Sequence, residues 1–331
     1  MGVTELIRNS KAGQNQLSGF SLNMFSDDEL RDIHSATLEV LNDTGILVMD
    51  KEARDIMASA GCIVEGDIVR IPSYIVEETI RSCPSKVLLA GRNPKYDMIL
   101  EGRRVGFTNF AVGVMIVDPY TGELQETTND SVGKTALICD AMDQVDIFSS
   151  AVVGRDMPEY SQDLHDSVAM FTNTSKHISH GDLISGENTK RFFRMAAEIV
   201  GGEDELRKRP IVSTITCPVS PLQLSDLSCR IIIESARWGI PCNVLSMAMS
   251  GATSPITLAG TLVTHNAEVL GGLVLSQATC KGAPIIYGSS TTTFDLTYVT
   301  APVGAPELGM TSAGVAALAD LYNLPSYVAG G

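Results

Sequence analysis

From about residue 131 onwards, short apolar segments alternate with segments long enough to be helices. The predicted strands are residues 147–156, 176–182, 210–218, 241–247, 284–290 and 325–331. Parallel neighbours in a sheet need a long crossover between them, so this alternation is typical of βαβ units. The sequence therefore predicts a parallel sheet of about six strands.

Three of the predicted helices end in the same way. A Gly or Asn is followed two residues later by the proline that opens the next strand, in Gly239–Pro241, Gly282–Pro284 and Asn323–Pro325. Gly and Asn tolerate the left-handed conformation that ends a helix, and proline is accepted at the first residue of a strand. We also expect Ser220-Pro221 and Ser254-Pro255 to start helices, with the serine as cap and the proline at the first helical position. Reuse of one junction favours a barrel or a doubly wound sheet.

The predicted strands end in polar or small residues, and no glycine-rich dinucleotide motif or P-loop follows them. A ligand site spread over many strand ends suits a (β/α)8 barrel. We therefore expect an α/β fold, an incomplete (β/α)8 TIM barrel of which about six strands are present. Residues 131–331 form strands 1–6 in this interpretation, the remainder of the barrel is missing, and residues 1–130 form an N-terminal α+β cap region.

Composition excludes some classes of function. The formal net charge of −15 and the lack of a basic stripe argue against nucleic-acid binding. Seven scattered cysteines without a CxxC pair indicate reduced thiols and a cytoplasmic location. The apolar stretch Pro255–Cys280 contains His265, Asn266 and Glu268, so we expect a buried or interface helix rather than a membrane span, with these three as packing or interface residues.

Several long blocks closely resemble the trimethylamine methyltransferases. They are CPVSPLQLSDLSC, NVLSMAMSGATSPITLAGTLVTHNAEVLGGLVLSQ, YGSSTTTFDL, TAPVGAPELGM and LPSYVAGG, between Cys217 and Gly331. The resemblance implies a (β/α)8 barrel that moves one methyl group from trimethylamine to the cobalt(I) corrinoid of a cognate corrinoid protein and releases dimethylamine. It implies that the corrinoid is carried by that partner and that the chain itself binds no cofactor. We also expect a homo-oligomer.

In this family pyrrolysine, encoded by an in-frame amber codon, follows the VAG segment of a barrel strand. The resemblance therefore implies that this sequence stops at the amber codon directly after Gly331 and that pyrrolysine is the intrinsic catalytic residue of the full-length protein. Two alternatives stay open. The protein is a superfamily relative that demethylates a quaternary amine such as glycine betaine, or it is an inactive amber-terminated fragment.

The candidate pocket is the polar stretch after the fifth predicted strand. Its proposed substrate-binding residues are Tyr287, Ser289, Thr291 and Asp295. The alternative is a Ser/Thr-rich loop that satisfies its own backbone. An aromatic face suits a trimethylammonium group, and among Tyr287, Phe294 and Tyr327 we prefer Tyr287. Met247, Met249, Cys217 and Cys242 are expected in the core.

Three further residues complete the candidate site. Glu307 either accepts a proton or orients the amine, or it is simply an acid in the first turn of a helix begun by Pro306. His180 and Asp182 share one face of a strand and are predicted as a polar pair near the substrate. His177 lies on the opposite face, so we predict no metal site.

Overall fold

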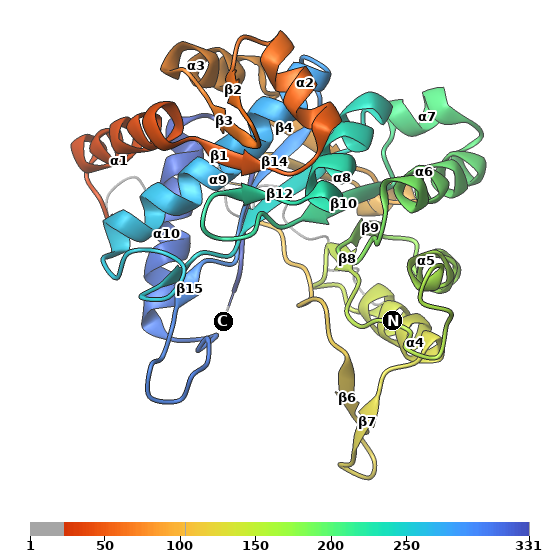
Figure 1. Ribbon diagram of the computed structural model, residues 1–331. Helices are drawn as coiled ribbons and strands as arrows, with labels where there is room; N and C mark the ends of the chain where they lie inside the picture. The colour runs from red at the N-terminus through yellow and green to blue at the C-terminus, as the bar shows by residue number, and fades with distance from the viewer. Residues whose placement is uncertain (1–22, 103, 331) are drawn as a thin grey trace.

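A six-stranded parallel sheet forms the centre of the protein. The computed structural model describes residues 23–102 and 104–330 (Figure 1). The strands of the sheet are β8 (Ile147–Ser149), β9 (His177–His180), β10 (Val212–Thr216), β12 (Cys242–Ser246), β14 (Ile285–Ser289) and β16 (Ser326–Val328). Their order in the sheet is their order in the chain, and all neighbours are parallel. A sheet that always advances in one direction is the wall of a barrel, not a doubly wound sheet.

All six predicted strands are thus confirmed, although the first and the last are much shorter than residues 147–156 and 325–331. Helices precede and connect these strands, and most of them pack on the sheet. They are α4 (Asn129–Ala141), α5 (Gln162–Asn173), α6 (Gly186–Val200), α7 (Glu203–Lys208), α8 (Asp226–Trp238), α9 (Leu258–Thr279) and α10 (Pro306–Leu321). Two short strands, β13 (Met249–Ser250) and β15 (Thr292–Thr293), continue the pairing of β12 with β14 beyond the sheet.

The shared helix ends adopt the conformation that the sequence predicts. Gly239 and Gly282 have φ of 70° and 85°, and Asn323 has a φ of 54°. The carbonyl of the proline two residues later accepts a backbone hydrogen bond from the preceding strand of the sheet, at 3.0, 3.2 and 2.9 Å in chain order. The same junction is therefore used three times to bring the chain back into the sheet.

The two predicted Ser-Pro helix starts are wrong. Helix α8 begins at Asp226 with Ser225 as its cap, and α9 begins at Leu258 with Thr257 as its cap. Ser220-Pro221 and Ser254-Pro255 lie in the preceding loops. Each helix starts later, where the hydroxyl of Ser225 accepts the N–H of Ser228 and that of Thr257 accepts the N–H of Gly260.

The N-terminal part forms a second layer on the far side of α9 (Figure 1). It contains α1 (Asp27–Glu39), the π-helical turn η1 (Val40–Thr44), β1 (Ile46–Val48), α2 (Lys51–Ser59), β2 (Ile63–Glu65), β3 (Ile68–Arg70) and α3 (Ser73–Ser82). The fourth strand of its sheet is β11 (Gln223–Leu224), which comes from the loop after β10 and pairs with β1. The two parts of the chain therefore share a sheet.

This second layer explains the apolar helix. Among the described residues, α9 is the one helix long and apolar enough to cross a membrane, yet 72% of its apolar window is buried inside the protein. It packs on β12 and β14 on one side and on α1, α2 and α3 on the other. Its hydrophobicity is that of a helix enclosed within the protein.

Two hairpins complete the fold. The first joins β4 (Lys86–Leu89) to β5 (Met98–Glu101) through the 3₁₀ turn η2 (Pro94–Tyr96), and its apolar side chains pack on Ile147 and Ile286. It therefore fills the concave side of the sheet near the amino ends of the strands and leaves the carboxyl ends uncovered. The second joins β6 (Met115–Val117) to β7 (Leu124–Glu126) through residues 118–123 and projects from the body (Figure 1).

Candidate functional site

The partners of the side chains show which face of β14 is the inner one. The hydroxyl of Tyr287 donates to Oδ1 of Asn266 on α9 at 2.7 Å, so Tyr287 faces the helices. Ile286 packs with the β4–β5 hairpin on the concave side. Because successive residues of a strand alternate, Gly288 and Ser290 also point inwards. We call the inner face at the carboxyl ends of the strands the mouth.

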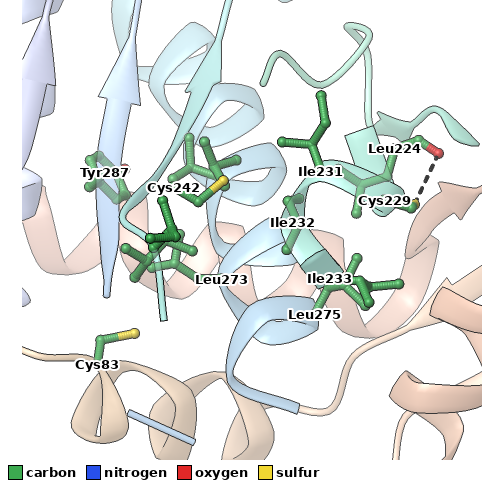
Figure 2. Close-up of a cluster of buried hydrophobic side chains, with 14 of the residues drawn as sticks. Cys83, Leu224, Cys229, Ile231, Ile232, Ile233, Cys242, Leu273, Leu275 and Tyr287 are labelled. Carbon is green, nitrogen blue, oxygen red and sulfur yellow. Dashed lines mark hydrogen bonds between the residues drawn. The ribbon is translucent and has the colours of Figure 1, made fainter. Parts of the chain in front are cut away.

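Tyr287 and Ser289, predicted at the mouth, therefore lie behind the sheet. Tyr287 is 0% exposed, and its ring meets those of His265 and Tyr322 edge-on, with centroids 5.3 and 6.0 Å away. Figure 2 shows both Tyr287 and Cys242 within the apolar core. Burial raises the pKa of Tyr287 well above its ordinary value. Strand alternation predicts that Tyr287 and Ser289 share one face of β14, but contacts with α9 determine which face it is.

The rest of the polar stretch is used within the protein. Oγ1 of Thr291 lies 3.1 Å from Nδ1 of His265, whose pKa burial lowers to about 3, so this imidazole is neutral. The carboxylate of Asp295 accepts the N–H groups of Thr297 and Tyr298 at 2.8 and 3.0 Å, which closes its own loop. These contacts match the alternative interpretation, a loop that satisfies its own backbone.

His180 and Asp182 form the predicted pair, with Nδ1 and Oδ1 2.8 Å apart. However, Nε2 of His180 lies 3.1 Å from the carbonyl of Asp163 and 3.0 Å from Oγ of Ser167, both on α5. The pair therefore braces the helix side of β9 and not its inner face. Burial disfavours the charged imidazole, but the Asp182 carboxylate outweighs it and raises the pKa of His180.

His177 faces the other way, as predicted. Its ring nitrogens lie 3.1 Å from the carbonyl of Ala90 and 2.9 Å from Oγ of Ser213, and burial lowers its pKa to about 4. Both nitrogens are thus occupied. In residues 23–102 and 104–330 no cluster of three or more His, Cys, Asp or Glu could hold a metal ion.

Glu307 is exposed in the first turn of α10, where the helix dipole favours a negative charge. Of the aromatic candidates, Tyr327 packs with the inner cluster beside Ile286, whereas Phe294 is half-buried. The inner face therefore offers Tyr327 and not Tyr287, the reverse of the preference drawn from the sequence.

The mouth also contains residues that the sequence did not indicate. Cys217 and Met247 each lie two residues after an inner position, Ile215 and Leu245 respectively. Both are exposed, Met247 at 49%. They were expected in the core. Gly288 was the overlooked signal, because a Cβ there would lie 2.0 Å from Oδ1 of Asn243. Glycine inside a strand often marks such a close approach, and here it marks the inner face.

Two buried polar atoms on the inner face have no partner among the described residues: Oγ of Ser149 and Oδ1 of Asn243. With Ser290 and the exposed Cys217 and Met247, they give this face a mixed polar and apolar character. A surface of this kind can hold a small ligand that has both apolar groups and a hydrogen-bonding atom.

Comparison with known proteins gives a consistent result. The family model described as trimethylamine methyltransferase (MTTB) matches residues 7–331. The chain is 54% identical over 323 residues to trimethylamine methyltransferase MttB of Desulfitobacterium hafniense, covering 97% of this chain and 65% of that protein. It is 50% identical over 331 residues to the protein of the same name from Methanosarcina barkeri, covering 97% and 66%.

A more distant relative is a glycine betaine methyltransferase of D. hafniense, 27% identical over 310 residues and covering 93% of this chain and 64% of that protein. The chain thus spans slightly less than two thirds of the length of these relatives. Among solved structures, the monomethylamine methyltransferase (MtmB) of M. barkeri matches with a TM-score of 0.54 and 12% identity, covering 91% of this chain and 67% of that one. This likeness supports the barrel fold alone.

Proposed function

Because this chain belongs to the trimethylamine methyltransferase family, we propose that the complete protein transfers a methyl group from trimethylamine to the cobalt(I) corrinoid of a cognate corrinoid protein and releases dimethylamine. The observation that carries the proposal is the identity of 54% and 50% to two trimethylamine methyltransferases over 97% of the chain. The identity of 27% to a glycine betaine methyltransferase makes a quaternary amine the second candidate substrate.

The reaction is a displacement at carbon. The bond from the amine nitrogen to one methyl carbon breaks and leaves its electron pair on nitrogen, while cobalt(I) gives an electron pair to the new cobalt–carbon bond and becomes cobalt(III). With trimethylammonium as substrate, the nitrogen keeps its proton and leaves as neutral dimethylamine. The work of the protein is to hold the amine, aim one methyl group at the partner and exclude water.

The mouth is the part of the chain suited to this work. Met247, Ser290 and Tyr327 lie on or beside it and combine apolar contact with hydrogen-bonding groups. Glu307, at the start of α10, remains proposed as a group that orients trimethylammonium or, where the amine must bind without its proton, as the acceptor of that proton. Asp295, His180 and Asp182 then act by shaping the loops and strands around the substrate, because their polar groups contact the protein.

Pyrrolysine belongs to this proposal as a hypothesis. It would follow the segment that contains β16 (Ser326–Val328), at the carboxyl end of the sheet. Pyrrolysine there would supply an electrophilic imine that binds the amine. The gene tests this directly: a TAG codon after that of Gly331, followed by an open frame, supports the hypothesis, whereas TAA, TGA or no open frame overturns it.

The activity is tested with the complete protein encoded by the gene, its corrinoid partner and a reductant that maintains cobalt(I). Absorbance reports methylation of the corrinoid, and chromatography reports the amine product. Trimethylamine should give dimethylamine in equal amount to methylated corrinoid. Faster methylation from glycine betaine would instead favour the second substrate. No methylation from either amine would contradict the proposed activity and favour the alternative of an inactive fragment.

The same preparation addresses the remaining proposals. We propose that the protein is a homo-oligomer. We also propose that it is located in the cytoplasm, in keeping with seven free cysteines that form no disulfide. Light scattering measures the native mass, and a monomer would contradict the proposed assembly.

A further inference from the structure

We propose that Glu268 is a positioning residue that holds two loops of the mouth in place from behind the sheet. The role in catalysis rests on the proposed methyltransferase function, whereas the role in holding the loops does not. Glu268 lies on α9, 1% exposed, and its side chain reaches between the ends of β10 and β12. It touches no part of the inner face, so any effect on the reaction must pass through the loops.

The carboxylate of Glu268 is held by three neutral donors from two segments. Oε2 accepts from Oγ of Ser246 at 2.6 Å and from Oγ of Ser220 at 2.9 Å, and Oε1 accepts from the backbone N–H of Leu222 at 3.0 Å. Among the described residues the influences on its charge are burial and these three hydrogen bonds, and no Lys, Arg or His is among them. Burial raises its pKa, against these three hydrogen bonds. A buried acid without a cation is costly unless its acceptors are occupied.

The first segment needs this acceptor. Leu222 has a φ of 58°, an unfavourable conformation for a branched side chain, at the tip of a tight turn. Val219 and Gln223 exchange two backbone hydrogen bonds, of 2.8 and 3.0 Å, that close the turn. The N–H of Leu222 therefore points out of the turn, and Glu268 is its acceptor. Without the carboxylate this N–H, at a half-buried position, would lose that acceptor.

The second segment is the end of β12. Ser246 donates to Glu268 through its side chain, and its carbonyl accepts the N–H of Ser290 at 2.9 Å. The next residue is Met247, which is exposed at the mouth, and the turn held by Glu268 directly follows Cys217. One carboxylate thus fixes two neighbouring parts of the mouth relative to each other.

The test uses the complete protein with the variants Glu268→Ala and Glu268→Gln. Glu268→Ala should raise amide hydrogen exchange at residues 219–224 and 246–250 by at least about tenfold, because charge-assisted hydrogen bonds to both segments are lost. Glu268→Gln should stay within about threefold of wild type, since its oxygen can still accept from Leu222 and its NH₂ can donate to the two serine hydroxyls.

The matched control is Gln277→Ala, at the other end of the same helix. Oε1 of Gln277 accepts the backbone N–H of Gly282 at 2.7 Å, and the side chain is similarly buried. This variant should raise exchange near Gly282 and leave residues 219–224 and 246–250 unchanged. If Glu268→Ala proves insoluble, Ser246→Ala removes one donor and should raise exchange in the same segments by a smaller factor.

Methyl transfer provides the second readout. kcat/KM for trimethylamine should fall at least about tenfold in Glu268→Ala, because small misplacements of a pocket are costly, and should be largely restored in Glu268→Gln with an unchanged pH profile. If Glu268→Gln is as inactive as Glu268→Ala, or removes a limb of the pH profile, the carboxylate acts by its charge or proton and the proposal fails. It also fails if exchange in the two segments does not change. If wild type itself transfers no methyl group, the proposed function fails, while exchange still decides the role of Glu268.

Discussion

The strand ends are braced from behind by two polar clusters that carry charge in different ways. The α9 cluster consists of His265, Asn266 and Glu268, and the α5 cluster consists of Asp163, Asp166, His180 and Asp182. In the α9 cluster the one carboxylate is held only by neutral donors. In the α5 cluster a carboxylate faces a buried imidazole, which gives the cluster a local ion pair.

The remaining acids of the α5 cluster resemble Glu268. Asp163 accepts from Nδ2 of Asn188 at 2.8 Å and from the N–H of Ile184 at 3.1 Å. Asp166 accepts from the N–H of Gly154 at 3.0 Å, and burial raises its pKa. Each of these acids fixes a loop that follows β8 or β9. Buried carboxylates therefore hold loops that follow β8, β9 and β10 from the helix side of the sheet. The exception is the pair of His180 with Asp182, which is an ion pair.

The two clusters should therefore lose stability to different extents when one partner is removed. Loss of one neutral donor leaves a carboxylate with other partners, so the effect is graded. Loss of one member of a buried ion pair leaves the other without compensation, so the effect is steep.

Asp182→Asn should have the largest effect. It removes the charge opposite His180 and should lower the free energy of unfolding at neutral pH by about 2 to 3 kcal/mol, near the low end for a broken buried pair because His180 can release its proton. Urea denaturation of the complete protein measures it. Asp28→Asn, which breaks an exposed pair with Arg31, is the control and should cost less than about 0.5 kcal/mol. Equal effects would show that burial of the pair contributes nothing.

The pH dependence of stability should show the same pair. The pKa of His180 is raised above 6.5, so its stabilising contribution is complete below pH 6.5 and is lost as pH rises through the higher value. The loss amounts to about 1.4 kcal/mol for each unit by which the pKa is raised. Urea denaturation at several pH values measures it, and Asp182→Asn should flatten the curve above pH 6.5.

His177 provides the internal contrast for this experiment. Its pKa is lowered to about 4, so its contribution is present above pH 6.5 and is lost as pH falls towards 4. His177→Gln should therefore alter only the acid side of the curve. A variant of His177 that changes the alkaline side would contradict the assignment of the two histidines.

Thr291→Val should have a smaller effect on the α9 cluster. It removes the hydroxyl beside Nδ1 of His265 and leaves a neutral buried nitrogen without its partner, which should cost about 1 kcal/mol. Thr172→Val, at an exposed position of α5, is the control and should be close to neutral. A loss as large as that of Asp182→Asn would remove the distinction between the clusters.

Glu307→Gln lies outside both clusters and should change stability least. Its carboxylate is exposed at the start of α10, so only the interaction with the helix dipole is lost, at most about 0.5 kcal/mol. Activity is the informative readout. A drop in kcat of about a hundredfold without loss of stability would support a role in proton transfer, a typical size for such a group, whereas unchanged kcat would leave Glu307 as a helix-stabilising acid.

Local sequence signals predicted the elements of this fold well. The left-handed helix ends at Gly239, Gly282 and Asn323 depend on neighbouring residues only, and all three are confirmed. The Ser-Pro helix starts were wrong although the pattern is real, because Ser225 and Thr257 compete for the same role a few residues later. A local sequence pattern predicts a helix end or start correctly when only one nearby residue can take the capping position.

The candidate site was less predictable because it depends on which face of each strand turns inwards. The sequence paired His180 with Asp182 correctly, since residues two apart in an extended chain share a side. It could not tell that this side, and that of Tyr287, meets α5 and α9. That choice is made by contacts between distant segments, such as the bond from Tyr287 to Asn266. If the alternation along a strand is assigned one residue out of step, side chains of the core are placed at the mouth and those of the mouth in the core.

The pairing of β1 with β11 has a consequence for synthesis of the protein. Leu47 leaves the ribosome long before Gln223, its neighbour in the finished sheet. Until then β1 has β3 on one side and an unpaired edge on the other, and α9, on which this layer rests, has not been made. The N-terminal layer must therefore stay partly open until β11 and α9 have been made. Nascent chains of this protein should depend on chaperones until the ribosome has passed α9.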